Sequence, residues 1–119
     1  MEKVSLAQKF GLFSEHWSPK VVADLNGQQV KIAKFEGEFP WHAHAEEDEM
    51  FLVVRGRMEL RLRDRTVELA EGELFVVPRG VEHQPYAAQE AHVLMFEPAS
   101  TLNTGAERNE LTVDAPERL

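Results

Sequence analysis

The stretch that decides the fold is GEFPWHAHAEEDEMFLVVRG, residues 37–56. Two histidines, His42 and His44, stand one residue apart, and a run of three glutamates and one aspartate follows them and ends at Glu49. Alternate residues of an extended segment point to the same side, so both imidazoles can reach one metal ion. The apolar residues after Glu49 predict a strand that ends at the turn formed by Gly56. The stretch therefore predicts one half of a metal site.

Four acids of this run compete for the role of the carboxylate ligand. Glu49 begins the predicted strand and shares a face with Phe51 and Val53, so its carboxylate points inward with these two side chains. Glu49 is therefore the predicted ligand. The other three acids are expected to be solvated turn charges: Glu46, Glu47 and Asp48.

A third histidine, His83, follows the tight turn Pro78-Arg79-Gly80. This turn is expected to return the chain to the end of the sheet that carries the first two histidines. Three imidazoles and one carboxylate leave two positions free on a six-coordinate ion, as oxygen-activating and substrate-chelating metal sites require. The predicted metal ligands are His42, His44, Glu49 and His83.

Short strands are the main elements that the rest of the chain predicts, and the Asn26-Gly27 pair favours a hairpin turn between two of them. The segment 36–40 is expected to break the second strand, and Met58, Leu60 and Leu62 are expected to form one buried face. About eight or more strands at this spacing are typical of a sandwich or barrel. The predicted strands cover 21–23, 29–35, 49–54, 58–63, 67–69, 74–77 and 91–97, and the segment 42–44 is also predicted to be extended.

Both ends of the chain are expected to lie outside the barrel. Residues 4–13 have the apolar spacing of a short amphipathic helix, with Ser5 as its cap. The polar tail after Pro98 is expected either to wrap the barrel as an extended arm or to be partly disordered. Strands 50–54 and 74–77 are apolar on both faces, so the arms or a second subunit must cover one face, and we expect a homodimer.

The length of the chain predicts one domain over residues 1–119, and the strand pattern places its core barrel at about 21–97. A net charge of -8, from 21 acidic and 13 basic residues, predicts that the chain does not bind nucleic acid. No apolar run is long enough to cross a membrane, and the N-terminus lacks the features of a secretory signal, so we expect a cytoplasmic protein without a membrane partner. Because the chain has no cysteine, imidazole and carboxylate groups must hold any metal ion.

Two spaced motifs in the chain resemble those of the cupin superfamily, in particular its small single-domain members with a cupin 2 type conserved barrel. The resemblance implies an all-β jelly-roll barrel, or double-stranded β-helix, and assigns the four metal ligands to the residues predicted above. The interval from Gly37 to His42 is one residue shorter than usual, and Ala87 replaces an asparagine that often follows the last histidine. The first motif is Gly37, His42, His44, Glu49 and Gly56, and the second is Gly72, Pro78, Gly80 and His83.

The ligand set suits a divalent transition metal, which could be Mn, Fe, Co, Ni or Zn. We expect a small metal-dependent enzyme of the oxygenase type that acts on a small oxygen-bearing metabolite. The alternatives are an isomerase of a sugar or keto acid and a non-catalytic module that binds a small molecule, and no catalytic residue beyond the ligands stands out. His92 is expected in the core or behind the ligands, Trp41 at the barrel mouth or a subunit interface, and His16 at the surface. The remaining polar candidates are expected to be surface or rim residues: Lys31, Lys34, Arg55 and Tyr86.

Overall fold

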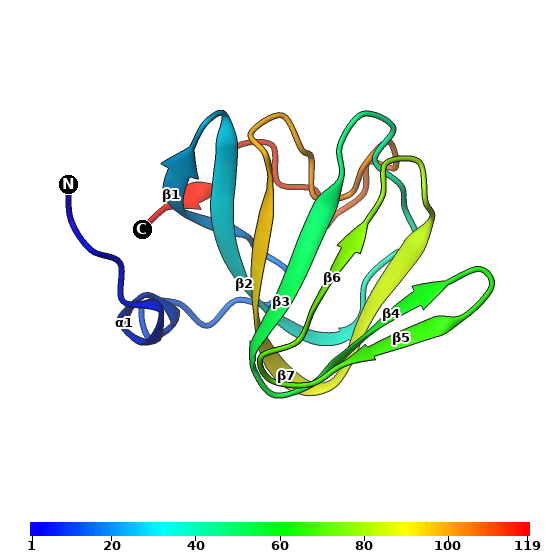
Figure 1. Cartoon of the computed structure of the whole chain (residues 1–119), viewed down its shortest axis with the longest axis horizontal. Coiled ribbons are helices and arrows are strands. Elements are labelled where there is room, and N and C mark those ends of the chain that lie inside the picture. Colours follow the sequence, from blue (N-terminus) through cyan, green and yellow to red (C-terminus); the bar gives the residue numbers. More distant parts are fainter.

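The computed structural model describes residues 1–119 and confirms the all-β barrel with a short N-terminal helix (Figure 1). No helix has the length and apolar character that crossing a membrane requires. The elements are α1 (Leu6–Phe10), β1 (Lys20–Leu25), β2 (Gln28–Glu38), β3 (Glu49–Arg55), β4 (Met58–Leu62), β5 (Thr66–Leu69), β6 (Leu74–Val77), β7 (His83–Pro98) and β8 (Glu117–Arg118).

The long strand β7 closes the barrel, because its two halves pair with different neighbours. Its first half pairs with β4, its second half pairs with β3, and β2 runs antiparallel to both halves. The exposed residues 88–90 lie between the two halves. The predicted strand at 91–97 is therefore only the second half of β7, and the strand begins at His83, directly after the turn region.

Strand β2 runs past the break that the sequence predicted at residues 36–40 and ends at Glu38. The pairing shifts register between Phe35 and Gly37, where the single residue Glu36 stands opposite residues 88–90 of β7, and Gly37 has a positive φ of +80°. Pairing with β7 then resumes opposite Ala87 and Tyr86. The glycine thus bends the strand without ending it.

The core fills the barrel with the inward-facing residues of each strand. In β4, Met58 and Leu60 are buried as predicted, whereas Leu62 at the strand end is half-buried. A second small cluster lies outside the barrel, where Phe10 and Phe13 from the N-terminal arm cover Ile32 of β2. The main core comprises Ala33, Phe35, Phe51, Val53, Met58, Leu60, Leu69, Val77, Ala87, Ala91, Val93 and Met95.

The predicted N-terminal helix is confirmed as α1, and the side chain of Ser5 accepts a hydrogen bond from the Gln8 amide as its cap. The C-terminal tail, residues 99–119, wraps the barrel, which decides between the two alternatives for this segment. It crosses the barrel end that is uppermost in Figure 1 and returns beside β1. There β8 pairs in parallel with β1, and the Leu119 amide donates to the Val21 carbonyl.

The outer face of β3 and β6 is apolar and only partly covered. Met50 pairs with Val76, and Leu52 pairs with Leu74, so these four side chains share the face turned away from the core. Leu74 is 54% exposed and Val76 is 48% exposed. The opposite faces of the same strands carry the buried residues Phe51 and Val77, as the two-sided apolar pattern predicted.

Candidate metal centre

Backbone pairing brings the first and last predicted ligands together. His42 and His83 form an isolated antiparallel bridge, in which each amide donates to the other residue's carbonyl. The carbonyl of His44 accepts from the Gly80 amide, which ties the His-x-His segment to the turn before His83. Glu49 enters from the first position of β3. Three chain segments therefore fix the four side chains at one end of the barrel.

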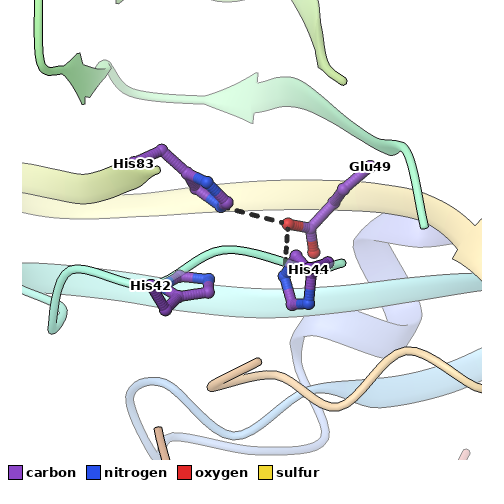
Figure 2. Close-up of side chains that lie close together, drawn as sticks. All are labelled: His42, His44, Glu49 and His83. Atoms are coloured by element: carbon purple, nitrogen blue, oxygen red, sulfur yellow. Dashed lines mark ion pairs between the residues drawn. The ribbon is translucent and has the colours of Figure 1, made fainter. Parts of the chain in front are cut away.

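The four predicted residues converge inside this end of the barrel (Figure 2). Each offers one ligand atom, and these atoms all lie within 4.8 Å of one another. Glu49 Oε1 lies 3.2 Å from His44 Nε2 and 3.4 Å from His83 Nε2. All four side chains are buried. The competing acids of the run are not part of this group, since Asp48 accepts from the Arg79 amide and Glu47 accepts from the Ser100 hydroxyl.

Backbone carbonyls orient two of the imidazoles for coordination. His42 Nδ1 lies 2.9 Å from the Pro40 carbonyl oxygen, and His83 Nδ1 lies 2.9 Å from that of Val81. A carbonyl oxygen can only accept, so each Nδ1 must carry the proton and each Nε2 must present its lone pair. A hydrogen bond of this kind also holds the ring orientation of histidines that ligate metal ions.

Three polar atoms that could ligate a metal ion are buried at the centre and have no hydrogen-bond partner: His44 Nε2, Glu49 Oε1 and His83 Nε2. Leaving a buried polar atom unsatisfied costs about 1–3 kcal/mol, so native proteins rarely keep several of them together. These atoms lie close to one another without the geometry of hydrogen bonds. Their arrangement fits a metal ion that would accept a lone pair from each donor.

Two of the four residues have pKa values shifted toward the protonation states that a metal requires. Burial, aided by the nearby His83 ring, lowers the pKa of His42 to about 4, so this imidazole is neutral at pH 7. Burial by itself would raise the pKa of Glu49, but the adjacent His44 and His83 rings lower it well below its ordinary value. Neutral imidazole and ionised carboxylate are the forms that bind metal ions.

A buried ion pair behind Glu49 was missed by the sequence analysis. Lys31 Nζ lies 3.2 Å from Glu97 Oε1, and both side chains are 3% exposed. Burial and the neighbouring Glu49 carboxylate raise the pKa of Glu97 well above its ordinary value. Lys31 was predicted at the surface or rim, and this prediction is wrong because Lys31 shares the inward face of β2 with Ala33 and Phe35. The period-two pattern of β7 could have placed Glu97 inward with Met95.

A small cavity of about 30 Å³ adjoins the centre, and His42 and Glu49 form part of its wall. Trp17 closes one side with a backbone φ of 60°, which is strained for a bulky residue. Its indole donates to the Glu36 carbonyl and stacks on Phe35 at a centroid distance of 4.3 Å. The rest of the wall is formed by Pro19, Ala33, Phe35, Phe39, Phe51, Pro85, Met95 and Asn103.

The other candidates lie outside this cavity. His92 lies on the outer face, stacked on Phe10 at 4.5 Å, so the prediction of a core or supporting position for it is wrong. Its neighbours Ala91 and Val93 point inward instead. Trp41 packs under the Arg63 guanidinium at the barrel mouth, as predicted. Four further residues remain at the surface or rim: His16, Lys34, Arg55 and Tyr86.

Comparison with solved structures shows the same fold in bacterial proteins. A cupin-2 domain containing protein from Shewanella frigidimarina is 45% identical, with a TM-score of 0.79, over 80% of this chain and 93% of that one. Protein NMB1881 from Neisseria meningitidis is 28% identical, with a TM-score of 0.76, over 82% of this chain and 100% of that one.

Sequence comparison points the same way. The uncharacterized protein YdbB of Bacillus subtilis is 31% identical over 64 residues, or 53% of this chain, and the match spans 57% of YdbB. Residues 28–97 match the family described as Cupin domain. This match covers more than half of the sequence and includes all four converging residues. The chain therefore belongs to the cupin family.

Proposed function

We propose that this cupin is a small metal-dependent enzyme of the oxygenase type that acts on a small metabolite bearing adjacent oxygen atoms. The observation that carries the proposal is the set of three buried donor atoms without hydrogen-bond partners beside a largely apolar cavity. A divalent transition metal held by His42, His44, Glu49 and His83 supplies free coordination positions for oxygen ligands and charge that polarises them.

The residues around the centre have separate tasks in this proposal. The Pro40 and Val81 carbonyls hold two imidazoles in their ligand tautomer, and Glu49 contributes the negative charge. Phe39 packs edge-on against His42 at a centroid distance of 5.3 Å, and Phe51 packs against His83 at 6.0 Å. These rings exclude water from the ligand side of the centre and offer an apolar surface to the body of the substrate.

The cavity wall favours an oxygenase over an isomerase. An isomerase must move a proton between two atoms of its substrate, which requires a positioned acid or base within hydrogen-bond reach. Apart from His42 and Glu49, the only polar residue in the wall is Asn103, whose amide does not titrate. Tyr86 lies against Arg61 instead, with 4.1 Å from the guanidinium carbon to the ring centre.

Three imidazoles and one carboxylate suit Mn, Fe, Co, Ni or Zn. The later metals of this series bind more tightly, so metal supply in the cytoplasm, where we expect the protein, would select the resident ion. The first measurement is therefore the metal content of the protein as purified, followed by removal of the metal and reloading with Fe(II) or Mn(II) under anaerobic conditions.

Oxygen uptake tests the reaction. The Fe(II)- and Mn(II)-loaded proteins are screened with an oxygen electrode against diketones, catechols and hydroxy acids. We expect uptake with at least one class, loss of uptake in His42→Ala, and unchanged uptake in His16→Ala, which changes an exposed histidine. Uptake that persists in His42→Ala would overturn the oxygenase proposal. Fully metallated protein that binds these compounds without converting them would identify a binding module.

We also propose that the apolar outer face of β3 and β6 is covered by a second copy of the chain. Leu74 and Val76 are among the most exposed large apolar side chains, and Met50 and Leu52 extend their surface. Sedimentation at micromolar concentration should show a dimer that Val76→Glu dissociates. The matched control is Leu25→Glu, at a residue that is 55% exposed in the β1–β2 hairpin. A wild-type monomer would remove this proposal.

A further inference from the structure

We propose that residues 102–116 of the C-terminal arm, here called the roof segment, determine which ligands reach the metal centre and must swing away to admit them. This inference rests on the proposed function of the centre as a metal site. The roof segment lies outside residues 28–97, the part of the chain that matches the cupin family.

The roof segment packs against the backbone of the His-x-His segment, between two of the candidate ligands. Gly105 packs on the backbone of Ala43, the residue between His42 and His44, and a Cβ added at Gly105 would overlap the Ala43 carbonyl oxygen. Gly105 also has a positive φ of +62°. A residue with any side chain at this position would therefore hold the roof segment away from the His-x-His segment.

The roof segment separates two spaces that meet at His42. On the inner side, Asn103 forms part of the wall of the cavity of about 30 Å³. On the outer side, residues 106–109 line an open groove of about 460 Å³, together with Trp41 and Ala43. His42 contributes to the walls of both spaces. Displacing the roof segment would therefore join the groove to the metal centre.

The volumes show why this displacement is needed. The inner cavity has room only for molecules of about the size of water or dioxygen. Pockets that hold small organic ligands measure about 300–1,000 Å³, a range that includes the outer groove but not the inner cavity. With the roof segment closed, the centre admits water or dioxygen, and an organic substrate requires it to open.

The hydrogen bonds of the roof segment allow it to move as one unit. Asn103 Nδ2 donates to the Leu111 carbonyl and Asn103 Oδ1 accepts from the Val113 amide, both at 2.9 Å. The Thr104 and Thr112 hydroxyls lie 2.7 Å apart. No hydrogen bond joins residues 102–116 to the barrel, whereas bonds to Lys31 and Glu47 anchor the chain just before, at Thr101 and Ser100. Opening would thus cost packing but no hydrogen bonds to the barrel.

The lining of the inner cavity limits the class of ligand that the metal centre can take. Within the arm, Asn103 uses one N–H of its amide nitrogen and one lone pair of its amide oxygen, and no charged side chain of the roof segment lines the inner cavity. The remaining walls are mainly aromatic and apolar. The ligand admitted is therefore a small molecule with an oxygen-bearing end for the metal and an apolar or aromatic body, and not a sugar with many hydroxyl groups.

Chemical modification of the metal-free protein tests the roof segment independently of metal binding. Diethyl pyrocarbonate is added, and carbethoxylation of His42 and His44, each 4% exposed, is followed by peptide mass spectrometry. We expect Gly105→Ala to accelerate their modification about tenfold, because it shifts the local opening equilibrium. The matched control is Gly27→Ala, which introduces the same backbone strain at φ +80° with no atom within 4 Å. Equal rates in folded wild type and Gly105→Ala would overturn the inference.

A second variant guards against misfolding of Gly105→Ala, which circular dichroism and the melting temperature would reveal. Asn103→Ala removes both side-chain bonds that hold the roof segment together and adds no bulk. We expect the same faster modification of His42. If neither variant exposes the histidines while both remain folded, the segment is a fixed wall and the inference is wrong.

Ligand kinetics then connect the roof segment to the metal. Co(II)-loaded protein is mixed with acetohydroxamate or with the bulkier benzohydroxamate, and binding is followed by the visible spectrum of Co(II). Gly105→Ala should accelerate binding of benzohydroxamate about tenfold and that of acetohydroxamate less, since the larger ligand requires wider opening. Equal rates for both ligands in wild type and variant would overturn the size selection. Absence of Co(II) binding would instead reject the proposed function, and the modification experiment would still decide the inference.

Discussion

The barrel at residues 28–97 and the two arms that flank it contribute different parts of the candidate site. All four converging residues come from the barrel, which is also the part that matches the cupin family. The arms contribute Trp17, Pro19 and Asn103 to the cavity wall. All four candidate metal ligands thus lie in the part of the chain shared with the family, which also forms most of the cavity wall, and the arms complete that wall with three residues.

The ion pairs of the barrel and of the C-terminal arm also differ in their exposure to solvent. In the barrel, Lys31 and Glu97 are paired out of contact with solvent behind Glu49. In the C-terminal arm, Arg118 pairs with Asp24 of β1, but the two side chains are 61% and 54% exposed. A buried pair is sensitive to the loss of one partner, whereas an exposed pair contributes little. The barrel should therefore respond to single substitutions much more strongly than the arms do.

The largest effect is expected for the ligands in the barrel. His83→Ala removes a completely buried imidazole whose Nε2 has no other partner, so metal affinity should fall about 100-fold or more. Competition with a chelator, followed by metal analysis, measures this loss. His16→Ala, which changes an exposed histidine of the N-terminal arm, should bind metal like wild type. Unchanged affinity in His83→Ala would place the metal elsewhere.

The strands of the barrel and its four candidate ligands were predicted well from the sequence, because strand alternation and motif spacing are local patterns. The alternation of strand residues placed Glu49 on one face with Phe51 and Val53, and the structure brings Glu49 to the three histidines. The register shift at Gly37 was not predictable, since a glycine and a nearby proline equally indicate the end of a strand. Only the pairing of β2 with β7, on both sides of the register shift, shows that the strand continues to Glu38.

Contacts between distant segments explain the other errors. Lys31 was expected at the surface from its charge alone, because its partner Glu97 lies 66 residues further along the chain. His92 was placed in the core from its position in an apolar strand, but it lies one residue out of phase with the inward-facing Ala91 and Val93. No pattern in the sequence predicts that Gly105 of the C-terminal arm packs against Ala43 of the barrel.

The buried pair gives the next largest effect. Glu97→Ala leaves the Lys31 ammonium buried, with only its hydrogen bond to the Thr101 carbonyl to compensate the charge. We expect the free energy of unfolding to fall by about 3–5 kcal/mol, as is typical when one partner of a buried pair is removed. Urea denaturation measures the change. A double variant, Lys31→Met with Glu97→Leu, should recover most of the loss, and failure to recover it would show that packing rather than charge explains the effect.

An intermediate effect is expected from pH in the metal-free protein. The pKa of His42 is lowered to about 4 in the folded state, whereas an unfolded histidine titrates near pH 6.5, so the unfolded chain binds more protons between these values. Stability is therefore complete above about pH 6.5 and falls as the pH decreases toward 4, by about 3 kcal/mol in total. Urea denaturation across this range measures the slope. His42→Gln should flatten the profile, and an unchanged slope would contradict the assignment to His42.

The smallest effect is expected in the C-terminal arm. Arg118 donates two hydrogen bonds to Asp24, at 2.7 and 3.0 Å, but solvent and salt screen an exposed pair. Arg118→Ala should therefore lower the free energy of unfolding only slightly, and this loss should shrink further in high salt. The backbone pairing of β8 with β1 does not depend on the side chain, so the arm should remain attached. A loss comparable to that of Glu97→Ala would show that the arm stabilises the barrel as strongly as the buried pair does.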